Sequence, residues 1–415
     1  MSRTEDYLDR VCAQISNDAL HTEIRAELRA HLDETIAELE RDGVAPADAV
    51  AGAFERLGDP AVVGKGLHKA HKPRLNLNLL GSTLLLVGMG LFSLAMAAYN
   101  LPPNTYLNQQ ILWIIMGMTC LAALYFVDYR RLAGWGWPLY YLTLGAVLLN
   151  LFFSQHGRYY RLDGFLMESA KIMFILSFAG TLAKQKKSPQ LGSILFYGAI
   201  PALALWGNNK PAALLLALVF FAMLWRVGLK GKRLLKMMAG FVSVCLVCLL
   251  KAPAYQLARL LVFLAPGRDS MGAGYVIVQS KKAIVSAGLW GKGLFTYNNL
   301  LPEQHTNFIY SSLVQQAGWA VGLVVLVVFI ALLYNIFRLL PGIKDDFPAL
   351  VTFGTGTMLA LNIFGSVGMQ VGLLPTMGIG LPFFSYGGSA VIANFVALGL
   401  VLNAAKENKN WVMQR

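Results

Sequence analysis

Charged residues are scarce in this chain. Of its 415 residues, 14% are charged and 56% are hydrophobic, whereas roughly a quarter of a soluble domain is charged. Acidic residues are scarcer still after residue 74: residues 75–415 hold 8 acids and 25 bases, while residues 1–74 hold 14 acids and 10 bases. The composition excludes an ordinary soluble protein, and the uneven charge places a domain boundary near Pro73.

Cysteine is also rare, which excludes a disulfide framework. The four cysteines are Cys12, Cys120, Cys245 and Cys248. Cys245 and Cys248 form a CxxC pattern inside the apolar run VSVCLVCLL, where thiols lack the access that redox chemistry or metal binding needs. We interpret them as buried small hydrophobic residues.

Long apolar runs dominate the chain after residue 75, and a spanning helix needs about 20 mostly apolar residues. Ten runs are present, at about 77–98, 109–127, 134–154, 165–183, 191–206, 211–228, 234–250, 308–337, 349–372 and 385–405. The sequence therefore predicts an all-α, polytopic membrane protein with about ten transmembrane helices. A small N-terminal helical domain precedes them.

Basic residues are concentrated in alternate loops, which predicts the orientation of the chain. One set of loops includes Arg130, Lys184, Arg226, Arg338 and Lys406. That set is predicted to be cytoplasmic. The chain is then a multi-pass protein of the bacterial cytoplasmic membrane, with both termini on the cytoplasmic side. Membrane topology explains the basic excess better than nucleic-acid binding does, and we expect no nucleic-acid partner.

Residues 1–72 predict a cytoplasmic domain of three or four short amphipathic helices. Ile24, Leu28, Leu32, Ile36 and Leu39 form one apolar stripe at helical spacing. The pattern EIRAELRAHL…GVAPADAVAGAFERLGDP resembles the prefix domain found ahead of some bacterial permeases and regulators. We expect a docking or stability module with an unknown cytoplasmic partner.

One long loop, residues 251–306, separates the seventh and eighth runs and is predicted to be extracytoplasmic. Its segment YVIVQSKKAIVSA has helical apolar spacing, so we expect it to be partly ordered against the bundle. By this topology Asp163, Glu168, Asp269 and Glu303 are the carboxylates in or beyond the membrane. Glu168 lies three residues before Lys171, and side chains at that spacing share a helix face. A charge inside a membrane segment is a functional candidate; a structural ion pair is the alternative.

Three ordered motifs resemble the SEDS (FtsW/RodA/SpoVE) family. They are GYVIVQSKKAIVSAGLWGKGL at 274–294, LPEQHTNFIYSSLVQQAGWAVG at 301–322 and GLLPTMGIGLPFFSYGGSAVIANFVALGL at 372–400. RLLVFLAP at 259–266 fits as well, so the resemblance extends over residues 73–415. It implies peptidoglycan glycosyltransfer from lipid II at the outer membrane face, in division, elongation or sporulation. It also implies a class B penicillin-binding transpeptidase as partner.

The resemblance assigns the catalytic carboxylate to an Asp in the pattern HTDF, but here the pattern reads His305-Thr306-Asn307-Phe308. A neutral amide cannot accept and release a proton as a carboxylate does. Glu303, four residues earlier, or Asp269 are candidates to replace it. The alternatives are a non-catalytic scaffold or regulator of a cell-wall synthase complex and, less favoured, a polyprenyl-lipid transporter.

The predicted site therefore has two parts. Its catalytic candidates are Asn307, Glu303, Glu168 and Lys171. Its candidates for binding lipid II or a related polyprenyl-pyrophosphate lipid are Arg158, Gln279, Ser280, Lys281, Lys292, His305, Ser385 and Tyr386. Lysines can hold pyrophosphate as point charges. A divalent cation is a possible cofactor, but the sequence predicts no metal-ligating residues.

Overall fold

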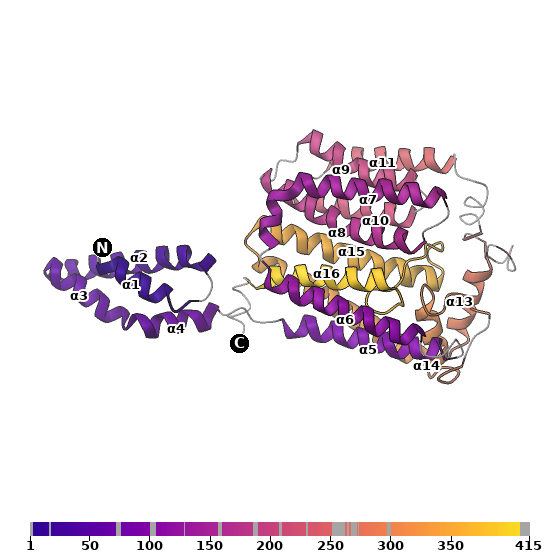
Figure 1. The fold of residues 1–415 in the computed structure, drawn as a ribbon, viewed down its shortest axis with the longest axis horizontal. Helices are drawn as coiled ribbons and strands as arrows, with labels where there is room; N and C mark the ends of the chain where they lie inside the picture. The colour runs from indigo at the N-terminus through magenta and orange to yellow at the C-terminus, as the bar shows by residue number, and fades with distance from the viewer. Residues whose placement is uncertain are drawn as a thin grey trace. The chain divides into compact units, whose positions relative to one another are not determined.

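The computed structural model describes residues 3–15, 18–71, 76–99, 105–127, 129–156, 160–185, 190–206, 210–229, 231–250, 262–263, 265–266, 272, 274–296 and 300–406. The chain divides into two compact units, residues 1–74 and 75–411. Figure 1 shows the helices of both units.

The first unit is a small bundle of four helices. They are α1 (Arg3–Cys12), α2 (Asp18–Arg41), α3 (Pro46–Leu57) and α4 (Pro60–His71). Leu8, Ile24 and Leu32 are buried in it, as the apolar stripe on α2 requires. Arg25 of α2 pairs with Glu5 and Asp9 of α1, which joins the two helices. The role of this unit as a cytoplasmic prefix domain stays a prediction.

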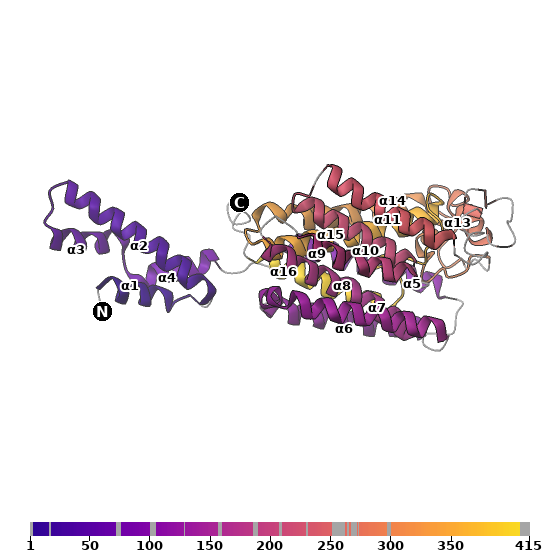
Figure 2. The ribbon, with the colours of Figure 1, turned by 90° about the horizontal axis from the view of Figure 1, so that it is seen from above.

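The second unit consists of long apolar helices that run beside one another (Figures 1 and 2). Its described helices are α5 (Leu77–Ala97), α6 (Thr105–Phe126), α7 (Gly136–His156), α8 (Tyr160–Lys184), α9 (Leu191–Trp206), α10 (Lys210–Arg226), α11 (Lys232–Leu250), α13 (Tyr275–Val285), α14 (Ile309–Arg338), α15 (Asp346–Val371) and α16 (Gly388–Ala405). Two short 3₁₀ helices, Tyr129–Trp135 and Leu340–Gly342, precede α7 and α15.

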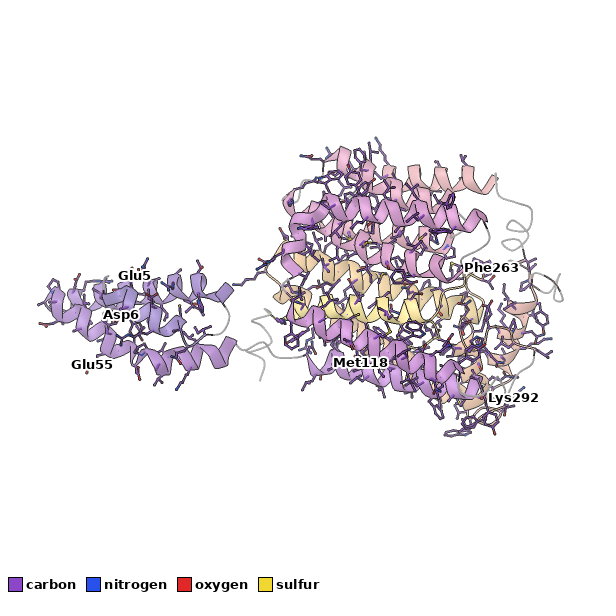
Figure 3. The ribbon with its side chains drawn as sticks, viewed as in Figure 1. Glu5, Asp6, Glu55, Met118, Phe263 and Lys292 are labelled. Carbon is purple, nitrogen blue, oxygen red and sulfur yellow. The ribbon has the colours of Figure 1, made fainter. Side chains whose placement is uncertain are left out.

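The membrane character of this unit is visible on its helices. Within the described residues, seven helices are long and apolar enough to cross a bilayer. Three further helices of this unit do not meet both requirements. The helices α9 and α10 are apolar but shorter, and α11 begins with basic residues. The outer flank of α6 exposes Ile111, Leu112, Ile115 and Met118, and Figure 3 labels Met118 on it. Such a flank is stable in lipid, so the predicted all-α polytopic class is confirmed.

Small residues let the helices approach closely. A Cβ atom built on Gly117 of α6 would lie 2.4 Å from the Phe395 ring of α16. One built on Gly388 of α16 would lie 2.6 Å from Trp113 of α6. Close backbone approach through small residues is a common way for helices to associate in membranes, where water no longer drives apolar groups together. The helices α6 and α16 are therefore closely packed, and the beginning of α16 lies beside the first half of α6.

The two ends of the bundle differ in chemistry. At one end, the Lys406 ammonium lies over the Tyr125 ring, 4.0 Å from its centroid, and Lys184 donates to the Gly134 carbonyl. At the other end, the Tyr99 and Phe295 rings are 5.2 Å apart. The helix α13 and the loop segments 288–296, 300–308 and 372–387 lie at this second end, which we call the loop end (Figure 1).

The helix α14 is broken near the loop end. Gly318 has φ 88° and ψ 172° inside it, a conformation that side chains with a Cβ rarely adopt. The backbone groups released by the break pair with the segment 288–293. Lys292 and Gly293 donate to the carbonyls of Gln315 and Gln316, while Trp319 and Ala320 donate to the carbonyls of Gly288 and Leu289. The sequence predicted the helix at 308–337 but not this break.

This pairing makes Gly318 essential for stability. A Cβ at Gly318 would lie 2.2 Å from the Leu289 carbonyl oxygen, and its positive φ adds backbone strain of about 1–3 kcal/mol. We expect Gly318→Ala to lower the thermal unfolding midpoint of the detergent-purified protein by several degrees. Gly88→Ala is the matched control, because a Cβ at Gly88 in α5 meets nothing within 4 Å. Equal midpoints for the two variants would contradict this account of the break.

Candidate functional site

Asn307, one of the catalytic candidates predicted from the sequence, lies at the loop end, directly beside Glu303. The Asn307 Nδ2 donates to Glu303 Oε2 over 2.5 Å. The segment between them is a tight turn in which Glu303 has φ 51° and its carbonyl accepts from Thr306 and Phe308 N–H groups. A carboxylate only accepts hydrogen bonds, so the Asn307 amide is a suitable partner for it. Glu303 is exposed and Asn307 is half-buried.

His305 of the same turn belongs to an aromatic cluster. Its ring lies 4.8 Å from the Tyr106 ring of α6 and 6.0 Å from the Tyr386 ring. The His305 carbonyl accepts the Tyr386 N–H, which ties the turn 301–308 to the loop before α16. Burial lowers the pKa of His305 below its ordinary value of 6.5, and the Glu303 carboxylate opposes that shift. At neutral pH the ring is therefore uncharged and can both donate and accept a hydrogen bond.

The loop 372–387 is anchored by polar residues at the beginning of α6. Gln110 donates to the Ser385 carbonyl and accepts the Gly387 N–H. The Tyr386 hydroxyl donates to Gln109 Oε1 over 2.5 Å. The Ser385 hydroxyl oxygen accepts the Leu381 N–H over 2.8 Å, so Ser385 closes a turn.

This anchored loop also reaches Asn307. A Cβ on Gly378 would lie 3.8 Å from Asn307 Nδ2. The loop therefore forms one wall beside Asn307.

A buried ion pair lies on α8. The Lys171 ammonium and Glu168 Oε1 are 2.6 Å apart, and the two side chains are 8% and 24% exposed. Gly164, one turn earlier, lies against Ser389 at the beginning of α16, so the pair is near the loop end. The spacing argument predicted this contact correctly. Its catalytic role stays a prediction.

Ser280 belongs to a buried polar network. Its hydroxyl lies 2.7 Å from the Ser311 hydroxyl and donates to the Gln370 carbonyl. The Gln370 side-chain oxygen accepts the Ser311 N–H over 2.9 Å, which satisfies an N–H group in the first turn of α14 that has no partner within the helix. The network joins α13, α14 and α15, so Ser280 has a structural role, while substrate contact by Ser280 stays a prediction.

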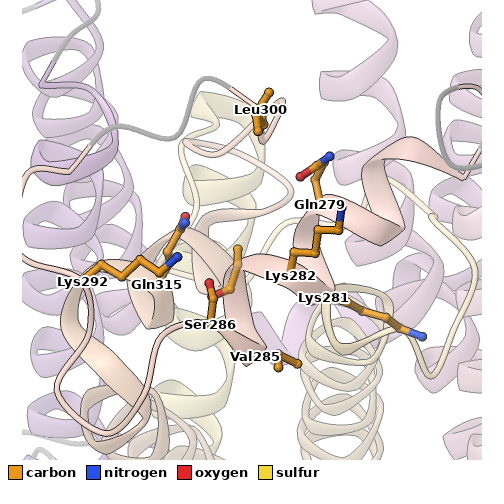
Figure 4. A pocket seen from close by; sticks show the side chains of 9 residues that line it. Gln279, Lys281, Lys282, Val285, Ser286, Lys292, Leu300 and Gln315 are labelled. Carbon is orange, nitrogen blue, oxygen red and sulfur yellow. The ribbon is translucent and has the colours of Figure 1, made fainter.

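A pocket of about 560 Å³ lies between α13 and the break in α14. Gln279, Lys281, Lys282, Ala283, Val285, Ser286, Lys292, Leu300 and Gln315 line it. Figure 4 shows Lys282 beside Gln279 and Lys292 beside Gln315, while Lys281 turns away from both. The Lys281 side chain packs on Gly372, because a Cβ there would lie 1.8 Å from its Cε. The pocket shares no lining residue with the Asn307–Glu303–His305 turn.

Two predicted residues, Arg158 and Asp269, lie outside the described residues. Among the described residues, no group of three or more His, Cys, Asp or Glu side chains could hold a metal ion. Divalent cations such as Mg²⁺ and Ca²⁺ prefer several oxygen ligands, and the turn around Asn307 supplies one carboxylate. These residues do not form a metal cage, and no chemical step here depends on one.

Several residues of the site were not predicted from the sequence. Tyr106, Gln109 and Gln110 lie in the first turns of α6, where they shape the aromatic cluster and anchor the loop 372–387. In the sequence, the two adjacent glutamines at the beginning of the apolar run 109–127 could have indicated these contacts. Gln370 gave a similar signal, since it is an amide near the end of the apolar helix α15, where it is fully buried.

A bundle of membrane helices with a polar cluster at one end defines a polytopic membrane protein whose site faces one side of the bilayer. The sequence profile of the FtsW/RodA/SpoVE family, described as "Cell cycle protein", matches residues 75–410. The chain therefore belongs to the FtsW/RodA/SpoVE family.

The relatives agree with this assignment. A "Probable peptidoglycan glycosyltransferase FtsW" from Geobacter sp. (strain M18) is 33% identical over 319 residues, which cover 72% of this chain and 86% of the relative. "Stage V sporulation protein E" of Bacillus subtilis (strain 168) is 35% identical over 178 residues, which cover 41% of this chain and 46% of the relative.

Solved structures share the fold. A chain from the work described as "Structural coordination of polymerization and crosslinking by a peptidoglycan synthase complex" has a TM-score of 0.68 and 25% identity. The similarity covers 82% of this chain and 99% of that chain. The rod shape determining protein RodA of Thermus thermophilus has a TM-score of 0.58 at 23% identity, covering 80% of this chain and 97% of RodA.

The lowered pKa of His305 predicts a pH dependence of stability. Because the pKa in the folded state lies below 6.5, the full stability is present above pH 6.5 and decreases as the pH falls from 6.5 toward the folded pKa. Between pH 7.5 and 5.5 the wild type should lose more thermal stability than His305→Gln does. His31→Gln, at an exposed position of α2, is the control. If His305→Gln has the pH dependence of the wild type, His305 is not buried in its neutral form.

Proposed function

We propose that this protein acts in bacterial peptidoglycan synthesis by transferring glycosyl groups from lipid II at the outer face of the cytoplasmic membrane. Membership of the FtsW/RodA/SpoVE family supports the process, and the FtsW relatives named as probable peptidoglycan glycosyltransferases support the reaction. In this proposal the polar cluster at the loop end supplies the reactive groups.

The orientation follows from charge. Lys184 and Lys406 lie at the end opposite the loop end, and basic residues favour the cytoplasmic side. Both termini are then cytoplasmic, and the turn 301–308 faces the outer leaflet.

The single observation that carries the proposal is the hydrogen bond between Asn307 and Glu303. Glycosyl transfer needs a base that removes the proton from a sugar hydroxyl as its oxygen attacks the anomeric carbon and the lipid pyrophosphate leaves. In this chain Glu303 supplies the carboxylate for that step, and the Asn307 amide orients it. The uncharged His305 beside them can hydrogen-bond a sugar hydroxyl.

The ion pair on α8 has a supporting role in this proposal. The Lys171 side chain is buried on the helix whose Gly164 lies against Ser389 at the beginning of α16, and a positive charge stabilises a leaving pyrophosphate. Glu168 pairs with that ammonium over 2.6 Å. A class B transpeptidase is the proposed partner, as the similarity to a chain from a peptidoglycan synthase complex supports.

A second candidate function is a non-catalytic subunit of a cell-wall synthase complex. The replacement of the family Asp by Asn307 favours it, because the amide at that position cannot act as a base. In this case the fold would serve to hold a partner or a lipid, and the hydrogen bond to Glu303 would be structural.

Polymerisation of lipid II by the purified protein tests the first candidate. We expect Glu303→Gln to lower the initial rate by about 100-fold or more, which is the contribution of a general base. Asn307→Asp loses the hydrogen bond to Glu303 but should raise the rate, because the new carboxylate stands at the family position and acts as the base itself. Asp346→Asn, at an exposed position of α15, is the control and should leave the rate unchanged.

The outcomes separate the two candidates. Polymer formation that Glu303→Gln leaves unchanged would exclude Glu303 as the base. A complete lack of polymer from both the wild type and Asn307→Asp would reject the enzyme and favour the non-catalytic subunit, provided that both proteins show cooperative thermal unfolding.

A further inference from the structure

The pocket between α13 and the break in α14 has the composition of an anion site. Among the described residues that line it, three are lysines and none is acidic. Figure 4 shows two of these lysines, Lys282 and Lys292, each beside a glutamine amide. Ammonium and amide groups donate hydrogen bonds to phosphate oxygens. The volume of about 560 Å³ falls in the range of small-molecule sites, about 300–1,000 Å³.

The surface next to the pocket is apolar and exposed. Trp290 is 80% exposed, and Leu289 and Leu294 are 59% and 53% exposed. These residues flank Lys292 in the segment 288–296, where glycines separate them. Because none of the described residues covers them, we call these three side chains the Trp290 rim of the pocket. Figure 3 places Lys292 at the loop end of the unit. Trp beside Lys is typical of a segment at the membrane–water interface.

Two contacts fix the position of this rim along the membrane normal. The Phe295 ring touches the Tyr99 ring, with centroids 5.2 Å apart, and Tyr99 lies two residues after the end of the membrane helix α5. The Lys292 N–H donates to the Gln315 carbonyl, and Gln315 lies in the second turn of α14. Both contacts place the segment at the ends of membrane helices, which is the level of lipid headgroups.

We propose that this pocket binds the phosphate of an anionic lipid headgroup from the leaflet at the loop end. Lys282 and Lys292 hold the phosphate, Gln279 and Gln315 add hydrogen bonds, and the Trp290 rim lies against the acyl chains. The position of the pocket at the level of the lipid headgroups favours a lipid over a soluble phosphate. The site is separate from the Asn307 turn, and the proposal does not depend on glycosyl transfer.

Fluorescence of Trp290 tests the proposal in the full-length protein. The protein is placed in phosphatidylcholine nanodiscs that contain a minority of brominated phosphatidylglycerol or, in a second arm, the same fraction of brominated phosphatidylcholine. The Trp290 signal is the difference between the wild type and Trp290→Phe. We expect brominated phosphatidylglycerol to quench this signal at least about twofold more than brominated phosphatidylcholine, because the anionic lipid is enriched at the pocket.

Two variants assign the effect to the lysines. Lys282→Gln/Lys292→Gln should abolish the difference between the two lipids, whereas Lys282→Arg/Lys292→Arg should retain it. Lys232→Gln/Lys236→Gln, at exposed positions of α11, is the control with the same loss of charge and should retain the difference. Thermal unfolding of each variant verifies that it is folded.

Three results would overturn the proposal. The first is equal quenching by the two lipids in the wild type, which requires no variant. The second is an unchanged difference in a folded Lys282→Gln/Lys292→Gln protein. The third is loss of the difference on adding inorganic phosphate at submillimolar concentration, which would assign the pocket to a soluble anion instead of a lipid headgroup.

Discussion

The loop end of this protein depends on the backbone pairing around Gly318. A membrane helix that breaks must find new partners for its released N–H and carbonyl groups, because lipid supplies none. The segment 288–293 provides them through four hydrogen bonds to residues 315–320. The same pairing positions Lys292 at the pocket and joins the segment that follows α13 to α14.

The Asn307 turn shows how a single atom exchange changes the chemistry of a site. A carboxylate at position 307 would repel Glu303, whereas the amide donates a hydrogen bond to it. The charge of the turn is thereby carried by Glu303 alone among its described residues. His305, kept neutral by burial against Tyr106 and Tyr386, adds a polar group without adding charge.

Much of the fold could be predicted from the sequence. The ten apolar runs correspond to ten helices, with ends that differ by a few residues, because a spanning helix requires an apolar stretch that is visible in one dimension. The pairing of Glu168 with Lys171 was equally local. The break at Gly318 was not predictable, because glycine is common inside membrane helices and the partner segment lies some 25 residues earlier.

The sequence by itself determined the membrane class and the positions of the ten apolar runs, since each depends on local composition. Only the tertiary structure decided which polar residues meet. It placed Asn307 beside Glu303, His305 beside both Tyr106 and Tyr386, and Lys281 away from Lys282 and Lys292. These contacts depend on packing between segments far apart in the chain, and the physical reason is that a hydrogen bond or ring contact requires a separation of a few ångströms that sequence spacing does not encode.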